Sequence, residues 1–172
     1  MKKRKLLLFL ILICITLFTV TGCFGNNKKS ITTEEFETKL KKKNFIINDV
    51  KATQFSDVPE ISKGVIAIDE TNNYQIEFYE CTSTESAKTM YERNKQIFES
   101  DKGNNSAYTN VDLNDYQKYT LTTSDKYKVL TRINNTLIYI NADKKYKNTF
   151  ELSLLVTINP QLYLFLRFSI QV

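Results

Sequence analysis

The sequence predicts an α+β domain with a single, mainly antiparallel sheet of about six strands and two to three helices packed on one face. Three observations favour this class. Two Asn-Asn pairs are flanked by segments in which apolar and polar residues alternate, as in hairpin strands. Two other segments begin with a capping box and continue with apolar residues at helical spacing. The length of 172 residues suits one domain. Amphipathic helices and half-buried strands in one chain bury their apolar sides by packing as layers.

The first half of the domain begins with a helix predicted over about residues 33–43. Thr32 and Glu35 have capping-box spacing, and Ile31 and Phe36 occupy the two positions of a hydrophobic staple. A strand is expected at Phe45–Ala52. A hairpin with the strands Val65–Ile68 and Tyr74–Tyr79 is expected to turn at Asn72-Asn73.

The second half begins with a helix over about residues 84–101, capped by Thr82 with Glu85. The polar segment Asn104–Asn114 is interpreted as a loop. Asp143 is expected to cap a third helix that reaches Phe150. Three strands are predicted at about 116–122, 127–133 and 136–142, the last two joined at Asn134-Asn135 by a type I′ turn.

The two halves share an order of elements: helix, strand, hairpin on an Asn pair, and a helix directly after it. Val65–Ala87 and Val129–Phe150 are the closest stretches, although few residues are identical. An internal αβββ duplication is therefore a hypothesis, and it favours one sheet with the helices on one face.

The N-terminal residues 1–22 have the features of a secretory signal. Four basic residues, Lys2 to Lys5, precede a run of 15 mainly apolar residues, Leu6–Val20. As a helix this run measures about 1.5 Å per residue, which is shorter than the roughly 30 Å core of a bilayer. It is typical of a signal h-region.

Directly after this run, Val20-Thr21-Gly22-Cys23 resembles the lipobox of bacterial lipoproteins, with Val20 in place of the commoner Leu. The resemblance implies cleavage between Gly22 and Cys23 and a diacylglyceryl group on the Cys23 sulfur, which would anchor the protein on the extracytoplasmic face of the cell membrane. An uncleaved anchor helix, or secretion with an accidental cysteine, are the alternatives. The expected division is leader 1–22, lipidated cysteine and tether 23–30, α+β domain 31–150 and apolar extension 151–172.

The charge of the chain is concentrated in the leader. The whole sequence has 24 basic and 19 acidic residues, a net charge of +5, whereas removal of the four leader cations leaves 24 − 4 = 20 basic residues and a net charge of +1. A nearly neutral exported domain does not favour nucleic acid as a partner. The partners expected are the membrane, through the lipid, and an unknown protein or envelope component.

The C-terminal segment 151–172 differs from the domain before it. Glu151 and Arg167 are its only charged residues, and large apolar side chains occupy every even position from Leu162 to Val172. This alternation indicates an added edge strand or a poorly placed extension. Contact with a membrane and a reading-frame change that replaced a polar helix end are the other interpretations.

A binding face is predicted on the side of the sheet that is expected to be wet. Its candidate residues are Glu77, Tyr79, Lys128, Arg132 and Tyr139. Tyrosine provides contact area at low entropic cost, so tyrosines among mixed charges suit a binding surface. The plainer interpretation is that cross-strand tyrosine pairs cover an ordinary sheet face.

Catalytic chemistry has little support in the sequence. The chain contains no histidine, which excludes Ser-His-Asp and Cys-His sites and a histidine-bound zinc. The glycines do not form a phosphate-binding loop, and neither a metal site nor a cofactor is predicted. Cys81 is the last cysteine after Cys14 and Cys23 are assigned to the leader and the lipid. The acidic pairs Asp69-Glu70 and Glu77/Glu80 are expected to be solvated.

Beyond the lipobox, the composition of the chain resembles that of the small Lys- and Asn-rich lipoproteins of low-GC Gram-positive bacteria. Two segments share this resemblance: Tyr74-Gln-Ile-Glu-Phe-Tyr-Glu and Asn135-Thr-Leu-Ile-Tyr-Ile-Asn-Ala142. The resemblance implies a polar helix at the end, from which the apolar extension departs. The expected function is a non-enzymatic, membrane-anchored domain that binds a ligand or partner. The alternative is an accessory subunit or weak enzyme that uses carboxylates or Cys81.

Overall fold

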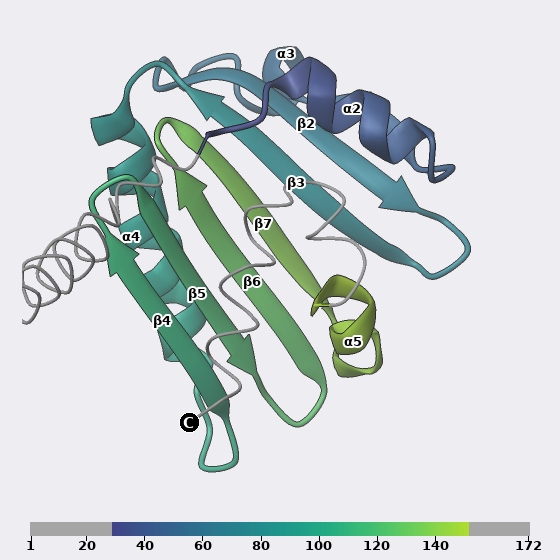
Figure 1. Ribbon diagram of the computed structural model, residues 1–172, viewed down its shortest axis with the longest axis vertical. Coiled ribbons are helices and arrows are strands. Elements are labelled where there is room, and N and C mark those ends of the chain that lie inside the picture. The colour runs from purple at the N-terminus through teal and green to yellow at the C-terminus, as the bar shows by residue number, and fades with distance from the viewer. Residues whose placement is uncertain (1–28, 152–172) are drawn as a thin grey trace, which may run out of the picture.

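The computed structural model describes residues 29–151 as one seven-stranded antiparallel sheet with the order β1-β2-β3-β7-β6-β5-β4 (Figure 1). The α+β class is confirmed, with seven strands rather than six. Lipobox residues Val20 to Cys23 and the extension beyond Glu151 lie outside the described residues. The elements are α2 (Thr33–Lys41), β1 (Ile46–Asp49), α3 (Lys51–Gln54), β2 (Ile61–Asp69), β3 (Tyr74–Cys81), α4 (Thr84–Ser100), β4 (Ala107–Leu113), β5 (Tyr116–Thr122), β6 (Lys126–Ile133), β7 (Thr136–Asp143), the 3₁₀ turn η1 (Lys144–Tyr146) and α5 (Lys147–Thr149).

The additional strand is β4, which occupies most of the segment predicted as a loop, Asn104–Asn114. It forms one edge of the sheet and pairs only with β5. Six of its seven residues are exposed, so neither side requires the apolar alternation by which strands are recognised. Thr109 and Thr120 share a hydrogen bond of 2.7 Å between their hydroxyls, which joins the two strands.

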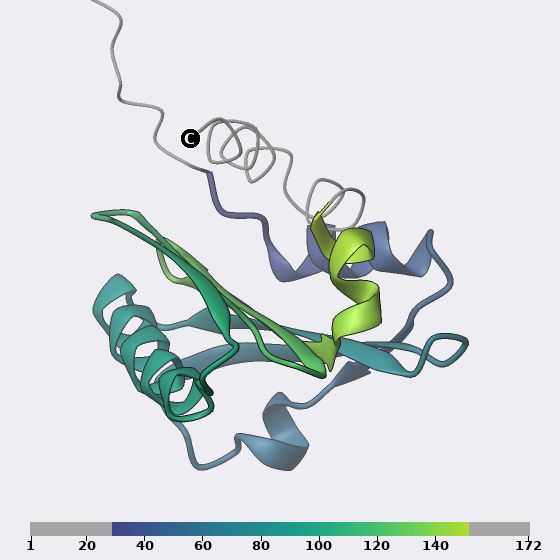
Figure 2. The same ribbon diagram turned by 90° about the horizontal axis from the view of Figure 1, so that it is seen from below.

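Helices cover both faces of the sheet, so the prediction that they share one face is wrong. Figure 2 shows α2 and α5 on one side and α3 and α4 on the other. Side chains alternate along β3, with Ile76 and Phe78 directed to the first side and Tyr79 and Cys81 to the second. Because both sides of this central strand are apolar, each needs a covering layer. The two sides are called the α2 face and the α4 face below.

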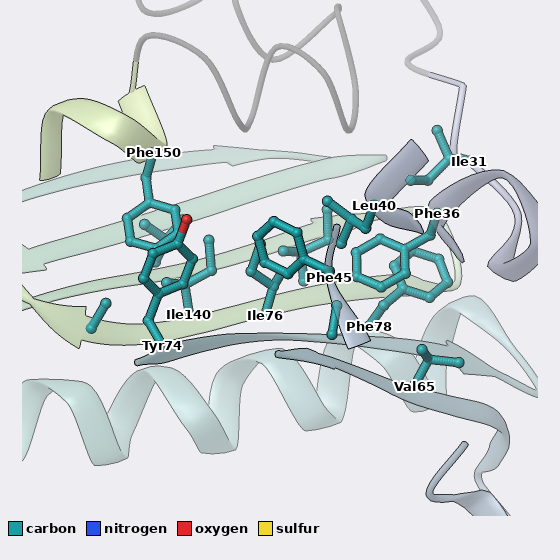
Figure 3. Packing of buried hydrophobic residues seen from close by; sticks show 14 of the residues in the cluster. Ile31, Phe36, Leu40, Phe45, Val65, Tyr74, Ile76, Phe78, Ile140 and Phe150 are labelled. Atoms are coloured by element: carbon teal, nitrogen blue, oxygen red, sulfur yellow. The ribbon is translucent and has the colours of Figure 1, made fainter. Parts of the chain in front are cut away.

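The α2 face carries the larger apolar cluster. Phe36 and Leu40 of α2 are fully buried, and the Phe36 ring stacks on Phe78 with centroids 4.8 Å apart (Figure 3). The predicted capping box is confirmed: the Thr32 hydroxyl accepts from the Glu35 amide at 3.2 Å, and the Glu35 carboxylate accepts from the Thr32 amide at 3.1 Å. The cap therefore starts α2 where its apolar side meets β3.

The α4 face is covered by the longest described helix, whose cap lies one residue later than predicted. Ser83, not Thr82, is the N-cap, and its hydroxyl accepts from the Ser86 amide at 3.0 Å. Helical spacing then buries Ala87, Tyr91 and Phe98 against the sheet. Their cluster on the α4 face includes Tyr119, Leu121, Leu130 and Leu137.

Asparagine residues end one helix and turn the two predicted hairpins. Asn44, Asn73 and Asn134 have φ values of 64°, 52° and 51°, a region that asparagine tolerates better than most residues. The predicted type I′ turn at Asn134-Asn135 is wrong, because that turn needs positive φ at both positions. Asn135 instead donates its side-chain amide to the Cys81 carbonyl at 3.0 Å, while its own carbonyl accepts from the Cys81 amide at 2.8 Å.

The helices contradict the duplication hypothesis. A two-fold rotation that exchanged the antiparallel strands β3 and β7 would keep corresponding helices on one face, yet α2 and α4 lie on opposite faces. Two local predictions also change. The strand predicted to extend to Ala52 ends at Asp49, and α3 follows it. Asp143 makes no side-chain cap and instead pairs with Lys126 at 2.8 Å.

Candidate functional site

The five predicted binding residues share the α4 face, but they do not form one open surface. Glu77 and Tyr79 belong to β3, Lys128 and Arg132 to β6, and Tyr139 to β7. Tyr79, Lys128 and Arg132 are buried, whereas Glu77 and Tyr139 are half-buried. The prediction of a wet face is therefore wrong over most of its extent, because α4 packs its apolar stripe there.

Arg132 is a structural residue beneath α4, with 1% of its side chain exposed. Its Nε donates to Gln117 Oε1 at 2.6 Å, and its terminal nitrogens donate to the carbonyls of Asn134 at 3.0 Å and Asn114 at 2.7 Å. These carbonyls belong to the turns of two neighbouring hairpins. Arg132 therefore joins the β4–β5 and β6–β7 turns, and its burial keeps it away from any ligand at the surface.

Gln117 extends this network to α4. Its Nε2 donates to Glu92 at 2.8 Å and to Asp112 at 3.0 Å. Burial lowers the pKa of Arg132, while the carboxylates of Asp115 and Asp112 oppose that shift. The network balances a buried cation with nearby anions, which explains why a charged residue is stable under a helix.

Lys128 closes the other end of the covered region. It is 8% exposed and forms an ion pair with Asp101, the C-cap residue of α4. Its ammonium also lies 5.2 Å from the centroid of the Phe98 ring. The long lysine side chain thus fastens the end of α4 to β6, and its charge is already neutralised.

Glu77 and Tyr139 lie at the edge of the area that α4 covers, where both are half-buried. The Tyr79 hydroxyl donates to Glu77 Oε2 at 2.6 Å, and Gln75 Nε2 donates to Glu77 Oε1 at 2.9 Å. Tyr139 lies opposite Glu77 in the register of β3 and β7, with its ring centroid 5.1 Å from that of Phe98. The carboxylate and the phenol are therefore held in place before any ligand arrives.

Burial and the Glu77 carboxylate keep both phenols of this region protonated. Burial, followed by the charge of Glu77, raises the pKa of Tyr79 and of Tyr139. At neutral pH the two tyrosines are neutral groups that can donate hydrogen bonds.

A shallow, open hollow of about 350 Å³ lies at this place. Its lining combines one glutamate, two tyrosines, three residues with side-chain amides and one isoleucine. It is lined by Ile68, Asn73, Tyr74, Gln75, Glu77, Tyr139 and Asn141. The sequence prediction identified two of these residues and missed the amides, which a pattern of strand alternation does not distinguish from ordinary surface residues.

A second hollow, of about 480 Å³, lies between the end of α4 and the β5–β6 turn. Its charged groups are already engaged: Lys128 pairs with Asp101, Lys126 pairs with Asp143, and Asp125 accepts from the hydroxyls of neighbouring turn residues. This hollow is larger than the first, but its charges hold the fold together, so it is the weaker candidate for binding.

Cys81 is poorly suited to nucleophilic chemistry. It is 2% exposed, and its Sγ lies 3.5 Å from the sulfur of Met90. Burial, with a smaller contribution from Glu60, raises the pKa of the Cys81 thiol to about 11. The thiolate is the nucleophilic form, so at neutral pH this cysteine is an unreactive core residue.

The acidic pairs are not arranged for acid–base catalysis. Asp69 caps the β2–β3 turn by accepting from the Asn72 amide at 3.0 Å and from its side chain at 2.9 Å. Glu77 and Glu80 lie on opposite faces, and Glu80 accepts from the Thr33 amide of α2 at 2.7 Å. Asp69, Glu77 and Glu80 therefore each have structural partners.

Lys118, on the α2 face of β5, is a buried charge that the sequence analysis did not single out. It is 5% exposed, and burial lowers its pKa to about 8, against the opposing effect of Glu151. The sequence predicted that Lys118 belongs to a strand, but the alternation of apolar and polar residues does not show that a lysine is buried.

Residues 29–151 contain no group of three or more cysteine, aspartate or glutamate side chains that could hold a metal ion. Within the same range, none of the helices is long and apolar enough to cross a membrane.

Comparisons of the chain with protein-family models, with curated proteins and with solved structures find no match.

Proposed function

We propose that the protein is a lipoprotein anchored on the extracytoplasmic face of the cell membrane, whose α+β domain binds a ligand or partner without catalysing a reaction. The observation that carries the anchor is Val20-Thr21-Gly22-Cys23 directly after a basic and apolar leader. Two acyl chains on Cys23 would hold the domain at the surface, since each buried methylene contributes about 0.8 kcal/mol.

Binding is assigned to the hollow around Glu77 and Tyr139. The carboxylate of Glu77 is an acceptor, the phenol of Tyr139 is a donor with an aromatic face, and the side-chain amides both donate and accept. This set fits the hydroxyl and amide groups of a polar envelope component better than the phosphates of a nucleic acid, because the only charged side chain lining it is an anion.

The anchor is tested by labelling cells with a radioactive or clickable fatty acid. The unaltered chain and Cys81→Ser are expected to take up the label, whereas Cys23→Ala is expected to stay unlabelled and to accumulate as a longer precursor. Label in the Cys23→Ala protein would contradict the lipobox interpretation.

Binding is tested by co-purification from detergent-solubilised membranes. Glu77→Gln and Tyr139→Ala are expected to lose most of the material that co-purifies with the unaltered protein. Asp125→Asn, in the second hollow, is the matched control and is expected to retain it. Equal retention by all three variants would place the binding surface elsewhere.

The alternative, an accessory subunit or weak enzyme that uses carboxylates or Cys81, is weakened by the burial of Cys81 and by the structural partners of the acidic pairs. Cys81→Ser is therefore expected to leave the physiological role of the protein unchanged, and a loss of that role with the fold intact would favour the alternative.

A further inference from the structure

The sheet ends at β4 with a long and regular edge. Within residues 29–151, β4 pairs only with β5, through seven consecutive residue pairs without a bulge. Six of its seven residues are exposed, with Tyr108 at 58% and Leu113 at 48%. It contains neither proline nor lysine, and Asp112 is its only charged residue. Natural sheets protect their edges with proline, lysine or a bulge, so an unprotected edge of this length indicates a pairing surface.

The opposite edge of the sheet has a different character. Strand β1 is only four residues long, ends in the charged Asp49 and is followed almost directly by α3. Helix α2 also packs against β1. On the other side of the sheet, α4 packs mainly over β3, β6 and β7, and Figure 1 shows β4 as the outermost strand there. Of the two edges, β4 therefore offers the longer and less crowded backbone.

The β4–β5 hairpin determines which backbone groups of β4 face outward. Its loop has two residues, so the flanking pair Leu113 and Tyr116 exchanges hydrogen bonds across the two strands. Hydrogen-bonded pairs alternate along an antiparallel ladder. Tyr108, Asn110 and Asp112 therefore direct their N–H and C=O groups away from β5, where another strand can bind them.

Strand β4 is complementary to a second copy of itself in the antiparallel direction. A two-fold axis at Asn110 sets Asn110 opposite its own copy and Tyr108 opposite Asp112. These are the three residues whose backbone groups face outward, so each of these pairs can exchange two hydrogen bonds. The same axis sets Ala107 opposite Leu113, which gives the exposed leucine an apolar neighbour.

The charges across this pairing are complementary as well. Tyr108 and Asp112 lie on the α4 face, because they are opposite Leu121 and Gln117 of β5. The Lys102 ammonium lies 3.8 Å from the centroid of the Tyr108 ring. Directly opposite side chains have Cβ atoms about 5 Å apart, so the Asp112 carboxylate of a second copy comes within reach of this ammonium. Asp112 accepts from Gln117 at 3.0 Å and keeps further acceptor capacity.

We propose that two copies of this chain pair through their β4 strands, antiparallel about a two-fold axis at Asn110, and form one continuous sheet. An axis perpendicular to the sheet keeps each face of the first copy on the same side as that face of the second. The hollow around Glu77 and Tyr139 lies on β3 and β7, away from β4. The dimer therefore leaves both hollows open, and both lie on the same side of the joined sheet.

Disulfide formation tests the pairing. The full chain with Asn110→Cys is treated with a mild oxidant in intact cells and analysed in a non-reducing gel. A band of twice the monomer mass is expected, because residue 110 lies opposite its own copy with Cα atoms about 5.5 Å apart, a separation that a disulfide can span. The unaltered chain is the control for the native cysteines and is expected to remain monomeric.

Two further positions test the register. Ala107→Cys alone and Leu113→Cys alone are expected to stay monomeric, because each residue is six positions, or about 20 Å, from its own copy along the strand. Co-expression of the two variants is expected to give the dimer band, because position 107 of one chain lies opposite position 113 of the other with Cα atoms about 4.5 Å apart.

Charges at the axis separate a loss of pairing from a loss of folding. Asn110→Lys and Asn110→Asp each set like charges opposite one another, so each is expected to reduce the co-purification of two differently tagged copies about three-fold. Co-expression of Asn110→Lys with Asn110→Asp sets opposite charges there and is expected to restore it, which misfolded variants would not do. Thr71→Lys, in an exposed turn, is the control and is expected to have no effect.

Four results would overturn the proposal. The first is the absence of a dimer band from Asn110→Cys although a maleimide labels its thiol. The second is an Asn110→Cys thiol that a maleimide does not label in the monomeric chain, because another segment or protein would then cover this edge. The third is a dimer band as strong from Ala107→Cys alone as from the mixed pair, and the fourth is unchanged co-purification of the Asn110→Lys copies.

Discussion

The two faces of the sheet are covered in different ways. On the α2 face, helix and sheet meet through aromatic and aliphatic side chains, such as Phe36 stacked on Phe78. On the α4 face, the helix covers an arginine, a glutamine and a lysine together with its apolar cluster. Charged residues at alternate strand positions therefore do not mark an open surface, because a helix that supplies partners at its edges can bury them.

The same comparison separates the α4 face into a structural part and a binding part. Arg132 and Lys128 use their donors on turn carbonyls, Gln117 and Asp101. Glu77 and Tyr139 lie at the edge of α4 and border an open hollow. The predictions below test whether these parts differ in stability and in binding as the contacts require.

The largest effect is expected from Phe78→Ala on the α2 face. Phe78 is fully buried, and its removal leaves a cavity under Phe36, so the free energy of unfolding is expected to fall by about 3–5 kcal/mol. Urea denaturation measures this, with Ile97→Ala as a control because Ile97 is 52% exposed. Similar losses in the two variants would show that the α2 face is not the main core.

Arg132→Ala is expected to cost about 2–4 kcal/mol, since it leaves Gln117 and two turn carbonyls without their buried donor. Arg93→Ala, at an exposed position of α4, is expected to stay within about 0.5 kcal/mol of the unaltered chain. If the Arg132→Ala variant were as stable as the unaltered chain but had lost binding, Arg132 would be a binding residue and not a structural one.

Lys118→Met is expected to stabilise the protein at neutral pH by roughly 1–3 kcal/mol. The folded pKa of about 8 lies below the ordinary value of 10.5, so the folded state binds the proton more weakly than the unfolded state. The cost of burying the charge is complete below pH 8 and disappears as the pH rises to 10.5. The advantage of Lys118→Met over the unaltered chain should fade across this interval, whereas Lys88→Met, at an exposed site, should show no such trend.

A smaller effect distinguishes the two possible caps of α4. Ser83→Ala is expected to lower the free energy of unfolding by about 1 kcal/mol, because it removes the acceptor for the Ser86 amide. Thr82→Ala should cost less, since the Thr82 hydroxyl makes only a 3.3 Å hydrogen bond to the Glu60 carbonyl. The opposite order would restore the cap predicted from the spacing of Thr82 and Glu85.

Local signals in the sequence predicted much of the fold. The capping box at Thr32 and both Asn hairpins depend on neighbours within a few residues, and each was found. Strand β4 was missed because it is an exposed edge strand, so its residues do not alternate between apolar and polar. Which face a helix covers was also missed, since it depends on the direction in which the chain leaves β3 and on distant strands.

The candidate site was predicted in part for a related reason. Alternation correctly placed Glu77, Tyr79 and Tyr139 on the same face, together with Lys128 and Arg132. It contained no information on where α4 ends, and that position decides which of the five stay accessible. Gln75 lies on the same strand as Glu77, whereas Asn141 became a candidate only when the pairing of β3 with β7 brought the two strands together.

The central claim is that the domain binds through the uncovered end of the α4 face. Site-specific photo-crosslinking in intact cells tests it most directly, with a photoreactive residue at Gln75 in one hollow and at Asn104 in the other. The account predicts a discrete crosslinked product from Gln75 that disappears with Tyr139→Ala, and none from Asn104. A product from Asn104 alone, or one from Gln75 that persists with Tyr139→Ala, would contradict the claim.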